Sequence, residues 1–107
     1  MSGKSSRAKG HRYELELVNK FKEFFPDCVT SRSESKRTDD AGVDLCYTGG
    51  FNVQAKNWEK APAYHDVLAK MPDNKLNLLF HRRNRKGSVV VMSEEDFWVL
   101  FGGYING

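Results

Sequence analysis

The stretches Gly42-Val43-Asp44-Leu45 and Phe51-Asn52-Val53-Gln54-Ala55-Lys56 predict two short strands joined by a turn at Thr48-Gly49-Gly50. Side chains alternate between the two faces of a strand. A three-residue loop with Gly50 in the left-handed conformation gathers the apolar residues on one face, pairing Tyr47 with Phe51, Leu45 with Val53 and Val43 with Ala55. The opposite face then carries Asp44, Cys46, Asn52, Gln54 and Lys56, with Asp44 directly across from Gln54. A two-residue loop would mix the two faces, so we predict the three-residue loop.

This polar face suits metal-dependent chemistry on phosphodiesters. A hard divalent cation takes oxygen ligands, which the carboxylate of Asp44 and the side-chain carbonyl of Gln54 can supply. Such a cation polarises a phosphate group and lowers the pKa of a bound water. Lys56 can position that water or stabilise negative charge in the transition state. The alternative is the solvated polar face of an ordinary hairpin, because antiparallel strands often expose one face to water.

A first helix is predicted from Gly10 to Phe25, because Pro26 cannot continue it. Its apolar stripe consists of Tyr13, Leu17, Val18, Phe21, Phe24 and Phe25. Glu14 lies on this stripe, whereas Glu16 lies on the solvent side. The helical phase therefore selects Glu14 as the acid that faces inward. The alternative is a glutamate at the edge of the stripe whose carboxylate reaches water.

The other segments predict further strands and helices. We expect strands over residues 28–31, 76–80 and 88–92, helices over residues 63–71 and after Ser93, and a polar loop over residues 32–41. The resulting order, α-β-β-β-α-β-β-α, predicts an α/β fold with a central mixed sheet flanked by helices. Residues 1–9 are expected to form a flexible basic arm, and residues 10–107 a single domain.

The length and composition of the chain limit the classes of protein to which it can belong. The chain has 107 residues, 39% of them hydrophobic, which is enough for one modest core. It has no apolar run as long as a membrane span, and no apolar segment typical of a signal peptide follows its basic N-terminus. Cys28 and Cys46 are too few for a disulfide framework or a zinc site and are expected to be free thiols. We expect a cytoplasmic protein that does not bind membranes.

Basic residues are distributed unevenly along the chain, although the net charge is only +3. They cluster in residues 1–12, in Arg32 with Lys36 and Arg37, and in residues 82–86. Phosphate backbones attract such arms and loops. Any single cluster is equally well interpreted as a solubilising terminus or turn. Three clusters around one candidate site favour a nucleic-acid partner.

Two parts of the chain resemble known nucleases. Asp44, followed about ten residues later by Gln54-Ala55-Lys56, resembles the core motif of the PD-(D/E)XK nuclease superfamily, in the form with Gln that is found in Mrr-like restriction endonucleases. The segment from Gly10 to Asp44 is similar to the archaeal-type Holliday-junction resolvases, which have a glutamate four residues after a glycine, as in Gly10 and Glu14. They also have a loop rich in Ser, Lys and Arg before the aspartate, similar to residues 33–37. Resolvases have glutamate where this chain has Gln54.

The resemblance implies a restriction-endonuclease-like core that cuts DNA with Mg²⁺ or Mn²⁺ and without an organic cofactor. Glu14, Asp44 and Gln54 would surround the metal, and Lys56 would position the attacking water. The implied substrate is branched DNA of the Holliday-junction type, cut by a homodimer. The resemblance and the basic clusters together predict that DNA is contacted by Lys9, Arg12, Arg32, Ser35, Lys36, Arg37, Arg82, Arg83, Arg85 and Lys86. The alternatives are a restriction-type endonuclease on linear duplex, which Gln54-Ala55-Lys56 favours, and a catalytically silent DNA-binding module, which the absence of an acid at position 54 favours.

Overall fold

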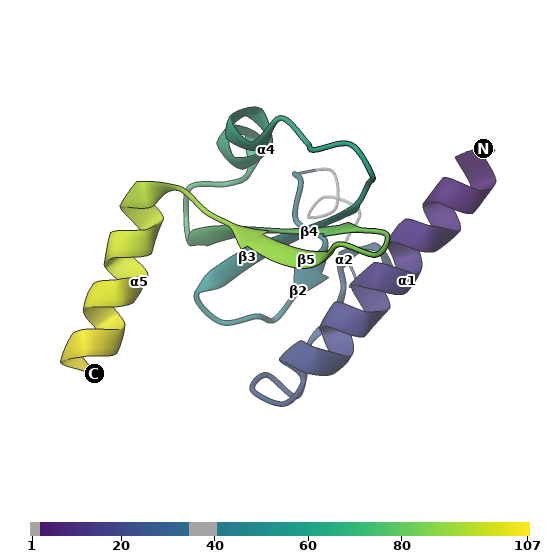
Figure 1. The fold of residues 1–107 in the computed structure, drawn as a ribbon. Helices are drawn as coiled ribbons and strands as arrows, with labels where there is room; N and C mark the ends of the chain where they lie inside the picture. Colours follow the sequence, from purple (N-terminus) through teal and green to yellow (C-terminus); the bar gives the residue numbers. More distant parts are fainter. Residues whose placement is uncertain (1–2, 35–40) are drawn as a thin grey trace.

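A mixed three-stranded sheet organises the molecule in the computed structural model, which describes residues 3–34 and 41–107. Strand β3 (Phe51–Asn57) pairs in parallel with β4 (Leu76–Arg83), and β4 pairs antiparallel with β5 (Gly87–Val91). The parallel pair is joined through helix α4 (Tyr64–Lys70). The fold is therefore α/β, as predicted, with helices on both faces of this sheet (Figure 1).

A second, two-stranded sheet replaces the predicted hairpin. Strand β2 (Leu45–Cys46) pairs antiparallel with β1 (Val29–Thr30), not with β3. One backbone hydrogen bond links this region to β3, from the amide of Asp44 to the carbonyl of Val53, at 2.7 Å. The predicted single central sheet and the predicted pairing of Leu45 with Val53 were thus wrong. Strand β4 pairs with one edge of β3, and of the residues before the turn, Asp44 bonds to the β3 backbone while Leu45 and Cys46 pair with β1.

The turn between β2 and β3 also differs from its prediction. Gly49, rather than Gly50, has a positive φ, at 64°. A Cβ atom on Gly49 would lie 2.6 Å from the ring of Phe25, so both the conformation and the space require glycine there. Tyr47 has a positive φ of 63° and is exposed, whereas Val43, Leu45 and Val53 are buried as predicted.

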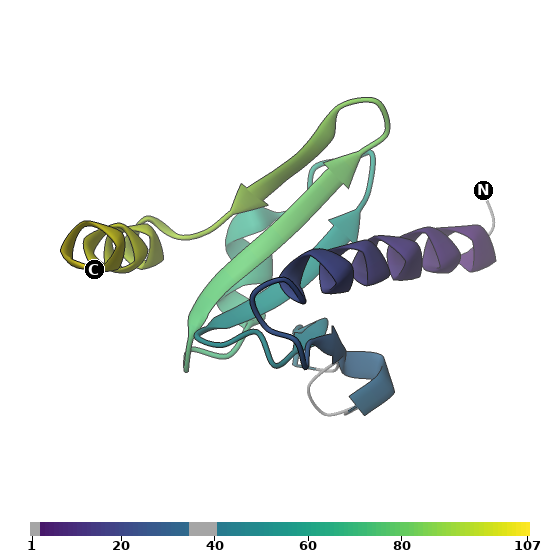
Figure 2. The ribbon, with the colours of Figure 1, turned by 90° about the horizontal axis from the view of Figure 1, so that it is seen from below.

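The helices lie at different places around the sheet. Helix α1 (Gly3–Phe21) packs against β3, and α4 lies over β4 on the opposite face, as Figure 2 shows from below. The short helix α2 (Ser31–Glu34) occupies part of the predicted strand and loop. Helix α1 begins at Gly3 instead of Gly10, so it includes most of the predicted basic arm. The predicted order of elements is confirmed, with α2 added.

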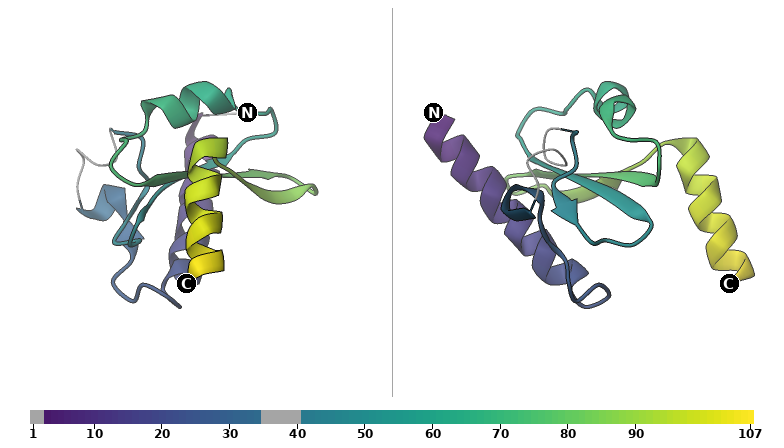
Figure 3. Two further views of the ribbon diagram at one scale, coloured as in Figure 1. Left: turned by 90° about the vertical axis from the view of Figure 1, so that its left-hand side faces the viewer. Right: turned by 180° about the vertical axis from the view of Figure 1, so that it is seen from behind.

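Helix α5 (Glu94–Asn106) projects from the end of the molecule opposite α1 (Figure 3). The hydroxyl of Ser93 accepts a hydrogen bond from the amide of Asp96 at 3.0 Å, which confirms the predicted cap. The molecule measures 47 × 28 × 25 Å along its principal axes. No helix in residues 3–34 and 41–107 combines the length and the apolar character needed to cross a membrane.

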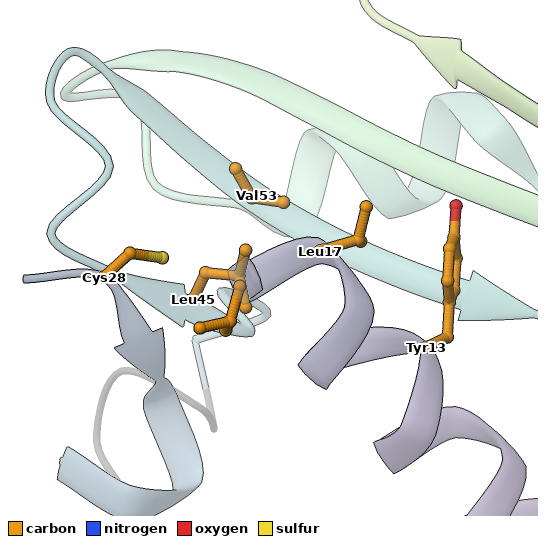
Figure 4. Packing of buried hydrophobic residues seen from close by; sticks show 6 residues of the cluster. Tyr13, Leu17, Cys28, Leu45 and Val53 are labelled. Carbon is orange, nitrogen blue, oxygen red and sulfur yellow. The ribbon is translucent and has the colours of Figure 1, made fainter. Parts of the chain in front are cut away.

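The core lies between α1, β3 and the two-stranded sheet. Its buried cluster consists of Tyr13, Leu17, Val18, Cys28, Leu45 and Val53. Figure 4 shows Leu17 and Tyr13 reaching from α1 toward the sheet. The helical stripe predicted from the sequence supplies half of this cluster, although Phe24 is exposed. Cys28 and Cys46 are free thiols, as expected, and burial raises the pKa of Cys28.

Candidate active site on strand β3

The alternation of side chains along β3 is the part of the predicted site that the fold preserves. Val53 and Ala55 pack toward the core cluster beneath α1. Gln54 and Lys56 point to the other face, where they line a cavity of about 420 Å³ beside α4. This face is not an open solvated surface, because α4 contributes to the walls of the cavity. Asn52, also on this face, is buried and donates to the side-chain oxygens of Asn74 and Asn77.

Asp44 lies alongside the middle of β3. One of its carboxylate oxygens accepts a hydrogen bond from the amide of Ala55 at 2.8 Å. Ala55 stands between Gln54 and Lys56, so the aspartate is anchored at the centre of the Gln-x-Lys sequence. The backbone bond from Asp44 to Val53 shows that the pairing is offset from the predicted register, in which Asp44 lay directly across from Gln54. The predicted proximity of Asp44 to this segment of β3 is nevertheless present.

Gln54 and Lys56 contact each other within the cavity. With its amide oriented to match its neighbours, Gln54 donates to the carbonyl of Gly42 at 3.1 Å and accepts from Nζ of Lys56 at 3.3 Å. Gly42 has a φ of 82°, and a Cβ atom there would lie 3.5 Å from the amide oxygen position of Gln54. The ammonium group of Lys56 also lies 4.3 Å from the ring centre of Trp58, in a cation–π contact. These contacts orient the lysine within the cavity.

Glu14 faces inward, as its helical phase predicts, with 6% of its surface exposed. Both of its carboxylate oxygens accept from the guanidinium group of Arg32, at 2.9 and 3.2 Å. Arg32 directly follows Ser31, whose amide donates to the carbonyl of Asp44 at 2.7 Å. The two predicted acids are therefore linked through β1 and the start of α2. Arg32, which we predicted to contact DNA, pairs with Glu14 and keeps 45% of its side chain exposed.

The donor set is compatible with a hard divalent cation. Asp44 and Gln54 present oxygen atoms, which are the ligands that hard divalent cations prefer. Glu14 could act as a further metal ligand only if its carboxylate gave up its hydrogen bonds from Arg32. Across the two described ranges, no three His, Cys, Asp or Glu side chains form a group that could hold a metal ion. The predicted set has two acids and one amide, so this observation does not bear on it.

Apart from Arg32, the predicted DNA-contacting residues divide into three groups. Arg12, Arg83, Arg85 and Lys86 are exposed. Lys9 and Arg82 are partly buried and make ion pairs within the chain, Lys9 with Glu59 at 3.7 Å and Arg82 with Glu16 at 2.7 Å. Ser35, Lys36 and Arg37 lie outside the described residues.

Sequence reasoning missed several residues near the site. His81 is buried, with its ring nitrogens 3.1 Å from the hydroxyl of Tyr64 and 2.8 Å from the carbonyl of Trp58. Asp66 and Lys70 of α4 line the cavity with Gln54 and Lys56. Their spacing of four residues on one helix was visible in the sequence. That α4 covers this face of β3 was not, because the hairpin prediction left the face open.

Comparison with known proteins identifies no relative. No protein-family model, no curated protein and no solved structure matches this chain. The function must therefore be argued from the residues and their geometry.

Proposed function

We propose that this protein is a metal-dependent endodeoxyribonuclease with a restriction-endonuclease-like core. The observation that carries the proposal is the anchoring of the Asp44 carboxylate at the amide of Ala55, between Gln54 and Lys56. A carboxylate, an amide oxygen and a lysine are thereby held on one short segment of β3. This combination suits the hydrolysis of phosphodiesters with Mg²⁺ or Mn²⁺.

Each residue has a separate role in the proposal. Asp44 and Gln54 would hold the metal, which polarises the phosphate and acidifies a water when it is bound. Lys56, oriented by Gln54 and Trp58, would position the attacking water and stabilise negative charge on the phosphate. Glu14 would complete the site after releasing Arg32. The branched-DNA substrate rests on the resemblance of residues 10–44 to resolvases.

A catalytically silent DNA-binding module is the second candidate, and one observation favours it. Both oxygens of Glu14 are engaged by Arg32, and position 54 carries a neutral amide. The site then has the carboxylate of Asp44 near the segment from Gln54 to Lys56, and that of Asp66 on the wall of the cavity. Fewer charged ligands lower the affinity for a hard cation.

Cleavage assays separate these candidates. We expect the protein to nick or cut a four-way DNA junction in the presence of Mg²⁺ or Mn²⁺, and to be inactive in EDTA. A linear duplex of the same sequence, cut more slowly, would favour the junction substrate, and equal rates would favour the restriction-type alternative. Binding of either DNA without cleavage under any metal condition would support the silent module instead.

We further propose that a second copy of the chain covers helix α5. Seven large apolar side chains of this helix are exposed, namely Phe97, Trp98, Val99, Leu100, Phe101, Tyr104 and Ile105. Residues 97–106 carry no charge, so the helix offers nothing to a phosphate backbone. At about 150–250 Å² for each aromatic side chain, the exposed fractions amount to several hundred Å² of apolar surface, the order of the roughly 800 Å² per partner in a stable interface. A two-fold dimer would bury the same surface on both copies and present two sites to the two strands of a junction.

The dimer can be tested with one exposed residue of α5. Tyr104 is 81% exposed, so Tyr104→Lys should leave the fold intact and, because it places a charge in the interface, weaken dimerisation by about tenfold or more. Asn19→Lys adds the same charge at an exposed position of α1 and serves as the control. Sedimentation velocity at micromolar concentration measures both. A wild-type chain that is monomeric with and without junction DNA would contradict the proposal.

A further inference from the structure

A second cavity lies on the α1 side of the sheet, away from the one that holds Gln54 and Lys56. Its volume is about 430 Å³, and it opens between α1 and the carboxyl ends of β3 and β4. Three cations line it, Lys9, Arg12 and Arg82, against the single acid Glu16. The carboxyl ends of neighbouring parallel strands are a common place for ligands in α/β sheets. The excess of positive charge indicates an anionic ligand.

Tyr13 contributes an unusual polar group to this cavity. The residue is 1% exposed, and its hydroxyl is buried and makes no hydrogen bond of good geometry among the described residues, although the side chain of Ser88 lies close enough to interact with it. The hydroxyl points away from α1, toward the sheet (Figure 4). Burial raises the pKa of Tyr13, an effect that Ser88 and Arg82 partly offset, so the hydroxyl keeps its proton at neutral pH. A buried donor without a partner is costly unless a ligand or a water satisfies it.

Two further residues complete the polar lining. Asn57, the last residue of β3, has a buried side-chain oxygen without a partner in the part of the chain that the structure describes. The guanidinium group of Arg82 lies 4.3 Å from the ring centre of Tyr13 while it pairs with Glu16. The cavity therefore brings together a hydroxyl donor, an amide and a held guanidinium. The hydroxyl and the guanidinium group can donate to the oxygen atoms of a phosphate, whereas the unpaired oxygen of Asn57 is an acceptor and cannot.

We propose that this cavity binds a phosphate group, with Arg12, Arg82 and the hydroxyl of Tyr13 as its donors. This proposal rests on the proposed function in one respect: the phosphate would belong to the backbone of the DNA substrate. Asn57 follows Lys56 directly, so a phosphate held here lies at the end of the strand that carries the candidate active site. The cavity would then fix the DNA backbone relative to Asp44 and Lys56.

The test uses the full chain in EDTA, so that binding is measured apart from cleavage. Arg12→Gln should weaken the affinity for a short labelled duplex about tenfold and lower the slope of log K against log salt by about 0.9. Lys20→Gln removes one exposed charge from the same helix and is the matched control. Wild-type affinity in the Arg12 variant would overturn the assignment.

Tyr13→Phe separates a phosphate site from a structural role. The hydroxyl makes no hydrogen bond of good geometry in the described chain, and Ser88 interacts with it only weakly, so its removal should change the thermal midpoint little, while the duplex affinity falls about threefold to tenfold. A purely structural tyrosine would give the opposite pattern, with lower stability and unchanged affinity, and that result would reject the site.

Titrations with inorganic phosphate and with the duplex identify the source of the phosphate. If the DNA backbone supplies it, the duplex shifts the amide resonances of Asn57 and Arg82 and competes with inorganic phosphate. If inorganic phosphate saturates the site and the duplex does not compete with it, the cavity is a phosphate site whose ligand is a free phosphate group rather than DNA. If the duplex binds through this cavity but is not cleaved in Mg²⁺, the proposed nuclease activity is rejected and the phosphate site stands. If the Arg12 and Tyr13 variants cleave DNA like the wild type, the phosphate site is rejected and the proposed nuclease activity stands.

Discussion

Replacement of Asp44 by asparagine is expected to lower the rate of DNA cleavage by at least about a thousandfold. The variant keeps an oxygen that can accept the hydrogen bond from the amide of Ala55, so the position of the side chain should be retained. It loses the negative charge that would hold a divalent cation. DNA affinity in EDTA and the thermal midpoint should therefore remain close to wild type, and only cleavage should fail.

Single-turnover cleavage of a four-way junction over a range of Mg²⁺ concentrations measures this effect. Asp73→Asn is the matched control, because Asp73 is exposed and lies outside the candidate site. Cleavage by the Asp44 variant at a rate near wild type would reject the metal site on β3. A fall in the thermal midpoint comparable with that of a core substitution would show that the carboxylate serves the fold.

The alternation along β3 and the phase of α1 could be predicted because both depend on local periodicity. Val53 faces the core, Gln54 faces away from it, and Glu14 turns inward. The pairing of the strands could not be predicted in the same way. The predicted register compared only the two strands of a hairpin. In the structure β3 pairs with β4, a longer parallel partner whose paired residues lie more than twenty positions away in the sequence.

The ion pairs were missed for a related reason. Arg32 and Glu14 are eighteen positions apart, and Arg82 and Glu16 are farther apart still, so no local pattern relates their charges. Both pairs engage residues that we predicted to contact DNA, Arg32 and Arg82, and neither pairing is visible in the local sequence. Local periodicity also does not show that α5 stands away from the sheet with its apolar side chains exposed.

The pair between Glu14 and Arg32 gives the second large effect. Glu14→Gln should lower cleavage by about a hundredfold or more if the carboxylate acts in the site. It should also lower the free energy of unfolding by about 1–3 kcal/mol, because a two-bond contact with a guanidinium group is lost, and the half-exposed position of Arg32 limits the loss. Glu16→Gln is the control. Its side chain is half exposed and pairs with Arg82, so cleavage at saturating DNA should hardly change.

Arg32→Gln decides between a catalytic and a structural Glu14. Both substitutions break the same ion pair, so both should destabilise the fold, and thermal unfolding measures this shared cost. Their effects on cleavage should differ. If Glu14 is needed for the chemistry, removal of Arg32 releases the carboxylate, and metal-supported cleavage is retained or rises while the Glu14 variant loses it. If Glu14 only anchors Arg32, the two variants should lose stability alike and cleave alike, which would remove Glu14 from the active site and leave Asp44 as the predicted acid that remains there.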